Sequence, residues 1–501
     1  MASASQRETL AFDFYVRRVA PELSGEFDSQ FWAGLVPRLC QAEPAIRHAV
    51  FALGSVYRAL AESDKLLPPA PGDPATTFSI AEYNKAISSL LSLDAGRTSG
   101  QEPTAIYLLA CILFVCIEFL MGNEMSSHSH IHQGRRLLRR LDEGGARRAS
   151  PQMEFIRREL VPIYSRLAVT SFTWGQTPEE IPPRMNLHVE VPTEFTSSDE
   201  ARACLYSAID DALRTSKDVR IIKFGRDGEA PAPPDLQAAE RMHQDVLSRL
   251  KSWNVAFTLY LASRSAVGGR QGPSPGERVM CMYYHVAYIW VSNSFSATET
   301  SYDDYMEHFT SVVSHASSMQ LAAPEARSAS PASSAGASPH SSTWTASDAS
   351  PSPPPFGLDA SGPRRGRAFM FHDNAIPPLY YVAFRCRHPR LRRTALSLLE
   401  QLSHISPREA LWDARELVPV AKKVIEIEEE KGEVELGDGR LSDKPPFGLS
   451  DDVRLREVLI GDKGHILKDP NGTWITIFRK PSEPDGQFVI NREWVQFSTG
   501  S

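Results

Sequence analysis

Apolar residues recur at every third or fourth position through most of the first 320 residues, and this period constrains the fold more than any other feature. Such spacing is typical of one face of an α-helix. From Pro44 to Glu62 the apolar stripe consists of Ile46, Ala49, Val50, Leu53, Val56, Tyr57 and Leu60. The same pattern predicts helices over Ile80–Leu93, Thr104–Met121, His128–Leu141, Met153–Phe172, Glu200–Thr215, Pro234–Arg264, Pro275–Asn293 and Tyr302–Met319.

The apolar run from Ala105 to Ile117 is the segment to test for a membrane-spanning helix. It is too short for a hydrocarbon core of about 30 Å, and Glu118 interrupts it. We therefore expect a buried core helix and no membrane association. The polar start, Met1 to Arg7, lacks the basic and apolar regions of a secretory signal.

The composition changes abruptly after the ninth predicted helix. Residues 331–355 contain 8 Ser, 6 Pro and 5 Ala. A segment like this cannot bury enough apolar surface to offset its ordering entropy, so we expect residues 324–367 to be disordered. The segment contains Ser-Pro steps at Ser330, Ser338, Ser350 and Ser352. Proline-directed kinases could phosphorylate these serines, although Ser-Pro is also simply common in such linkers.

Helical spacing resumes after this insert, so residues 368–431 are expected to continue the domain of residues 1–320. The last helix is predicted from about Glu409 to Glu430. Residues 432–450 then form a polar, acidic connection. In residues 451–501, turn signals at 469–472 and 484–486 each precede a run of residues with high β-strand propensity. This pattern predicts a short antiparallel hairpin or meander packed on the helices. The expected fold class is all-α with this small β extension.

Charge and cysteine content exclude several protein classes. With 54 Lys+Arg and 61 Asp+Glu the formal charge is −7, so the chain has no overall basic footprint for nucleic acid. Six cysteines are too few for a disulfide scaffold, and none forms a CxxC pair, so a closed zinc site is not expected. His128, His130 and His132 could hold a metal, but no carboxylate or Cys at ligand spacing completes the set. We expect polar or interhelical histidines there and no metal.

Charged clusters offer the remaining candidate sites. One cluster consists of Arg135, Arg136, Arg139 and Arg140, which we expect to form a solvated stripe on a helix rather than a phosphate site. The other is the Glu-rich run 426–435. We expect it to be a helix end that enters a solvated linker rather than an interaction surface. The tract Arg364, Arg365 and Arg367 could serve as a nuclear-import motif. The sequence has no Gly-rich phosphate loop, HExxH or GxSxG, so we assign no catalytic and no cofactor-binding residues and expect no enzyme activity.

Several segments together resemble the regulatory (middle homology) domain of fungal zinc-cluster transcription factors. The resemblance covers about residues 8–431 and rests on the order and number of short segments. They are Phe14–Val16, Pro21–Gly25, Phe27-Asp28, Phe31-Trp32, Glu43–Val50, Ala52–Gly54, Tyr83–Ile87, Leu108–Cys111, the His-x-x-x-Gly-x-x-Leu-Leu helix at His130–Leu138, Ala375–Tyr381, Cys386–Pro389, Arg392–Leu396 and Leu411–Asp413.

The resemblance implies an all-helical regulatory domain in a nuclear regulator of transcription, with the transcription machinery or partner regulators as its contacts. Members of that family carry an N-terminal six-cysteine cluster that holds two zinc ions and reads DNA. This sequence has no such cluster, so its DNA-binding residues are unknown and direct DNA binding is not expected. A regulator acting through partners, a decayed paralogue and a gene model lacking its first exon all stay open. A helical scaffold outside transcription is the alternative, a metal-dependent enzyme is a weaker one, and the chain could form a homodimer.

Overall fold

The computed structural model describes residues 5–62, 74–95, 104–143, 150–173, 177–224, 236–266, 272–319, 374–436, 444–445, 447–461, 471–479 and 489–497. Most of these residues are helical, which confirms the all-α fold class. The helices are α1 (Gln6–Phe14), η1 (Tyr15–Val19), α2 (Ala20–Ser24), η2 (Gln30–Leu35), α3 (Val36–Ala42), α4 (Pro44–Glu62), α5 (Pro74–Ala95), α6 (Thr104–Met121), α7 (Glu124–Glu143), α8 (Pro151–Phe155), η3 (Ile156–Leu160), α9 (Val161–Thr173), α10 (Ser198–Phe224), α11 (Leu236–Ala266), α12 (Pro275–Ser292), η4 (Thr300–Tyr305), α13 (Met306–Ser317), α14 (Ile376–Arg385), α15 (Pro389–Ile405) and α16 (Ala414–Leu436).

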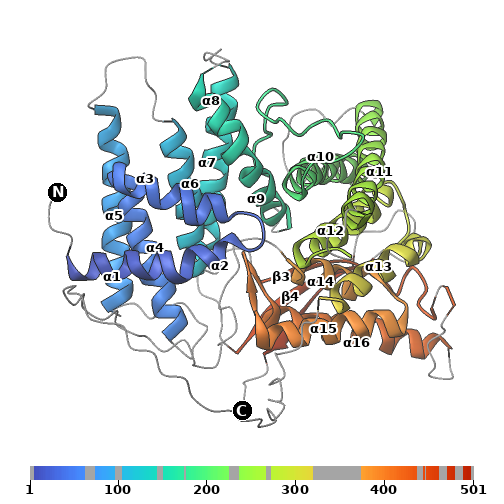
Figure 1. Ribbon diagram of the computed structural model, residues 1–501. Coiled ribbons are helices and arrows are strands. Elements are labelled where there is room, and N and C mark those ends of the chain that lie inside the picture. The colour runs from blue at the N-terminus through green and yellow to red at the C-terminus, as the bar shows by residue number, and fades with distance from the viewer. Residues whose placement is uncertain are drawn as a thin grey trace, which may run out of the picture.

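The helices pack around two large apolar cores. The first core is built mainly from the helices up to α9, and the second mainly from α10 to α16. Figure 1 shows the first group in blue to teal on one side of the molecule and the second in green to orange on the other. Helix α9 contributes to both, because Tyr164 and Leu167 lie in the first core and Val169 lies in the second.

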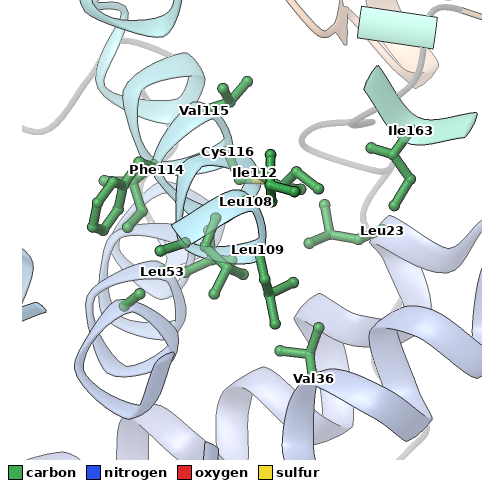
Figure 2. Packing of buried hydrophobic residues seen from close by; sticks show 14 of the residues in the cluster. Leu23, Val36, Leu53, Leu108, Leu109, Ile112, Phe114, Val115, Cys116 and Ile163 are labelled. Carbon is green, nitrogen blue, oxygen red and sulfur yellow. The ribbon is translucent and has the colours of Figure 1, made fainter. Parts of the chain in front are cut away.

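Helix α6 is the centre of the first core. Its bounds match the predicted helix, and residues on all of its faces are buried, among them Leu108, Ile112 and Phe119. Figure 2 shows this helix surrounded by Leu23, Leu53 and other side chains from neighbouring elements. Within the described residues, α6 is the one helix long and apolar enough to cross a membrane. Its burial on all sides is the property of a core helix.

The second core joins segments from both sides of the insert. Phe309 and Val312 of α13 pack in it together with Leu379 of α14 and Leu399 of α15. Residues 320–373, which include the segment expected to be disordered, lie outside the described residues. Helices on both sides of residues 320–373 therefore pack in one core.

Residues 408–413 correct the predicted start of the last helix. They form a two-stranded hairpin of β1 (Arg408–Glu409) and β2 (Trp412–Asp413), with Ala410 at a φ of 48°, and α16 begins only at Ala414. The hairpin places Ala410 and Leu411 in the first core. The Glu409 carboxylate accepts hydrogen bonds from the backbone N–H groups of residues 374–376, so it caps the start of α14.

The end of the chain forms an antiparallel sheet of β3 (Leu455–Ile460), β4 (Gly472–Arg479) and β5 (Val489–Gln496), in that order. This confirms the meander and adds a strand, β3, that the sequence pattern did not predict. Ile475 and Ile477 pack with Val420 and Val424 of α16 in a third, smaller core. Helix α16 extends to Leu436, so the predicted connection of residues 432–450 begins as helix.

Candidate functional site

The three histidines of α7 do not share one site, because His128 and His130 contact different neighbours. His128 Nδ1 lies 3.3 Å from the Ser171 hydroxyl of α9, and burial followed by the charge of His132 lowers its pKa to about 4. His130 Nε2 lies 2.8 Å from the hydroxyl of Tyr83, which itself donates to Glu118 Oε1. His132 is half-buried, and burial lowers its pKa too. Over the described residues, no group of three His, Cys, Asp or Glu side chains could hold a metal ion.

Gly134 lets α7 lie directly against α9. A Cβ at position 134 would overlap the ring of Tyr164, which is fully buried and donates a 2.8 Å hydrogen bond to the Leu108 carbonyl. The ring cannot move aside without losing that bond. This close contact explains why the segment His130–Leu138 has glycine between its histidine and its leucines.

Gly134→Ala is therefore expected to lower the free energy of unfolding by about 1–3 kcal/mol, because it overpacks a filled site. Chemical denaturation of the purified chain measures the change. Gly34→Ala is the matched control, since Gly34 is also helical and nothing lies within 4 Å of its added Cβ. An equal loss in both variants, or no loss at Gly134, would contradict this explanation.

Arg135 corrects the expectation of a solvated arginine stripe. Its side chain is fully buried and pairs with Asp210 of α10, while Nη1 donates to the Tyr164 carbonyl at 3.3 Å and Nε donates to the Glu179 carbonyl. Arg214 of α10 donates to the same Glu179 carbonyl at 3.1 Å. Of the four arginines, Arg139 and Arg140 are the exposed ones. The arginine thus connects a helix of the first core to a helix of the second.

Residues 26–28 make a second connection between the cores. The Asp28 carboxylate is buried and accepts hydrogen bonds from Arg166 of α9 at 3.1 and 3.2 Å and from Arg202 of α10 at 2.6 and 3.0 Å. The guanidinium carbon of Arg202 also lies 4.5 Å from the ring centroid of Phe27. One residue earlier, Glu26 Oε2 accepts a 2.8 Å hydrogen bond from the Gly276 N–H of α12.

Glu428 of α16 forms a third buried charge cluster with Arg387, which lies between α14 and α15, with Arg392 of α15 and with the start of β3. Its carboxylate pairs with Arg387 at 2.9 Å and Arg392 at 2.6 Å and accepts the Leu455 N–H at 2.7 Å. Burial alone would raise the pKa of Glu428, but these two charges and the hydrogen bonds from Arg387 and the Leu455 N–H outweigh it and hold the pKa at about 2. This corrects the view of the Glu-rich run as a wholly solvated helix end.

The cysteines carry no reactive thiolate. Each of the six is a free thiol, either buried or half-buried. Burial raises the pKa of Cys40 and Cys386 to about 11 and that of Cys111, Cys204 and Cys281 to about 12, and it raises the pKa of Cys116 further. A thiol is a nucleophile and a metal ligand only as the thiolate, so these side chains act as small core residues.

A surface groove of about 380 Å³ lies beside α4 and α5. It is open to solvent on one side, with His48, Lys85 and Ser92 among its lining residues. Small-molecule sites are usually enclosed and mostly apolar, so the groove identifies no ligand class. The tract Arg364, Arg365 and Arg367 lies outside the described residues.

Several of the residues that join the elements come from the segments that carry the resemblance. Asp28, Tyr83, His130, Gly134, Arg387 and Arg392 all come from those segments and all make the contacts described above. Their spacing along the chain gave no sign of these partnerships. Glu428 was missed because it was grouped with its acidic neighbours, although it lies four residues after Val424 on the apolar face of α16.

Comparison with known proteins points to transcription. The chain is 25% identical over 239 residues to the aspercryptin biosynthesis cluster-specific transcription regulator atnN of Emericella nidulans. The match covers 46% of this chain and 37% of that protein's length. No protein-family model and no solved structure matches the chain. The chain is thus a distant relative of a fungal transcription regulator.

Proposed function

We propose that this chain is the helical regulatory body of a nuclear transcription regulator. The observation that carries the proposal is the distant relationship to a curated fungal transcription regulator. The family-like segments support it, because several of their residues make buried or partly buried contacts between elements rather than lying exposed on the surface. The relationship also favours a role without catalysis.

The proposed regulator acts through partner proteins. None of its six cysteines lies in a CxxC pair, and each is a free thiol in a helix or next to one. These thiols therefore offer no two-zinc cluster to place a helix in the major groove. In this proposal the helical body attaches to another protein that binds DNA and supplies sequence recognition.

Loss of the chain should change transcription. Deletion of its coding sequence is expected to alter the levels of a discrete set of transcripts, and a tagged chain at its own locus is expected in the nucleus. RNA sequencing and fluorescence microscopy measure the two outcomes. An unchanged transcript profile together with a stable cytoplasmic complex would reject the proposal in favour of a scaffold outside transcription.

The basic tract contributes nuclear import in this proposal. Replacing Arg364, Arg365 and Arg367 with alanine is expected to reduce the nuclear share of the tagged chain at least twofold. Arg139→Ala with Arg140→Ala is the matched control, because these two arginines are exposed on α7. An equal nuclear share in both variants would show that the tract is not a nuclear-import motif.

A further inference from the structure

The C-terminal sheet has one buried face and one face of exposed aromatic and cationic side chains. Ile475, Ile477 and Val495 lie on the buried face, against α16. Because side chains alternate between the faces of a sheet, the residues between them lie on the other side. The register pairs Trp474 with Trp494, Thr476 with Arg492 and Phe478 with Ile490. We call this the Trp474–Trp494 face.

Its two tryptophans are held next to each other in a defined geometry. Their ring centroids lie 5.4 Å apart at 67°, and the guanidinium carbon of Arg492 lies 5.4 Å from the Trp474 ring centroid. The Trp494 ring covers Gly472, where a Cβ would collide with it. Cross-strand aromatic pairs and cation–π contacts of this kind fix ring positions.

The face stays exposed despite these contacts. Trp474 is 43% exposed, Trp494 39% and Ile490 57%. Apolar patches of this kind mark binding sites, and Trp and Arg are the residues most enriched among energetic anchors at interfaces. Grooves lined by aromatic rings are the usual recognition surface for peptides in the polyproline-II conformation.

We propose that the Trp474–Trp494 face binds a proline-rich peptide in the polyproline-II conformation, and that its occupant is the chain's own segment Pro351–Phe356. That segment reads Pro-Ser-Pro-Pro-Pro-Phe. Proline rings stack on indole rings at little cost in conformational entropy, because proline already restricts the backbone. The inference is independent of the role in transcription.

The length of chain between the segment and the sheet allows this docking. Phe356 precedes Asn374, where the described structure resumes, by 374 − 356 = 18 residues. A stretch of 18 residues spans at most about 60 Å. Helix α14, which starts two residues after Asn374, is about 15 Å long by its rise of 1.5 Å per residue, and its Tyr380 and Phe384 pack against the core beneath the sheet. The segment can therefore reach the exposed face.

Charge complementarity favours the same occupant. Asp348 and Asp359 flank the proline run on its two sides. Arg492 is the cation on the Trp474–Trp494 face and lies beside Trp474. Covalent linkage also gives the segment an effective concentration in the millimolar range, so a weak peptide site would be occupied within the chain.

A fluorescent peptide of residues 346–361, added to purified full-length chains, tests the proposal. In one variant, residues 348–359 are replaced by a Gly/Ser linker of equal length, which vacates the site. The peptide is expected to bind this vacated chain saturably and to bind the wild-type chain roughly tenfold or more weakly, because the internal segment competes. A peptide in which alanine replaces the prolines serves as the ligand control.

Trp474→Thr with Trp494→Thr, introduced into the vacated chain, is expected to abolish peptide binding. Threonine suits exposed strand positions, and circular dichroism confirms that the sheet is retained. Leu91→Gln, at a 72% exposed position on α5, is the matched control and should leave binding unchanged. No binding to the vacated chain, or binding that survives loss of both tryptophans, would overturn the site. Equal binding of the peptide to the wild-type and vacated chains would show that segment Pro351–Phe356 does not occupy the Trp474–Trp494 face.

Discussion

Glu428→Gln is expected to lower the free energy of unfolding by about 3–5 kcal/mol, the typical cost of removing one partner from a buried charge cluster. Glu428 is fully buried, and its replacement removes the carboxylate that the buried Arg387 and Arg392 share, so that Arg387 keeps only the longer, 3.6 Å pair with Glu299. Denaturant titration of both chains at neutral pH measures the loss. Glu429→Gln is the matched control, because Glu429 pairs with the half-exposed Arg393 and should cost about 1 kcal/mol or less.

The same substitution should make stability less sensitive to acid. The pKa of Glu428 is about 2, below its ordinary value of 4.5. A lowered carboxyl pKa contributes stability above the unfolded-state pKa and loses it as pH falls through the folded-state value. The difference in unfolding free energy between wild type and Glu428→Gln should therefore be largest above pH 5 and shrink toward pH 2. A difference that is independent of pH would contradict the assigned charge state.

Asp28→Asn is expected to cost a similar 3–5 kcal/mol and to weaken the coupling between the two cores. The neutral amide leaves Arg166 and Arg202 buried without their shared carboxylate. Calorimetry should show the second core melting apart from the first, where the wild-type chain melts with the two coupled. Asp13→Asn, which breaks the exposed pair with Arg17, serves as the control and should leave the melting profile unchanged. A wild-type-like profile for Asp28→Asn would show that residues 26–28 do not join the cores.

The helices could be predicted where their apolar period is strong and uninterrupted. Helices α4 and α6 begin and end at the predicted residues. Helix period depends only on residues a few positions apart, so it is visible in the sequence. The hairpin at 408–413 could not be predicted, because Leu411 and Trp412 fit the helical spacing of the next segment. The backbone conformation of these two residues is set by their packing against distant elements.

The buried charged contacts between the two cores were less predictable than the helices, because they join residues far apart in sequence. Asp28 meets Arg166 and Arg202 across 138 and 174 positions, and Arg135 meets Asp210 across 75. An arginine that spans two cores and one that faces solvent look alike in a helical pattern, so Arg135 was placed wrongly with Arg139. Glycine was the more informative signal, since Gly134 marks a close approach that a larger residue would block.

Tethering the chain to DNA tests whether it regulates transcription. The full chain is fused to a bacterial DNA-binding domain, and transcription is measured from a reporter that carries the matching operator in fungal cells. The fusion is expected to change reporter transcription several-fold relative to the DNA-binding domain alone, and the destabilised Gly134→Ala fusion is expected to change it less. Reporter output equal to that of the DNA-binding domain alone, with the fusion present in the nucleus and bound at the operator, would contradict a role in transcription.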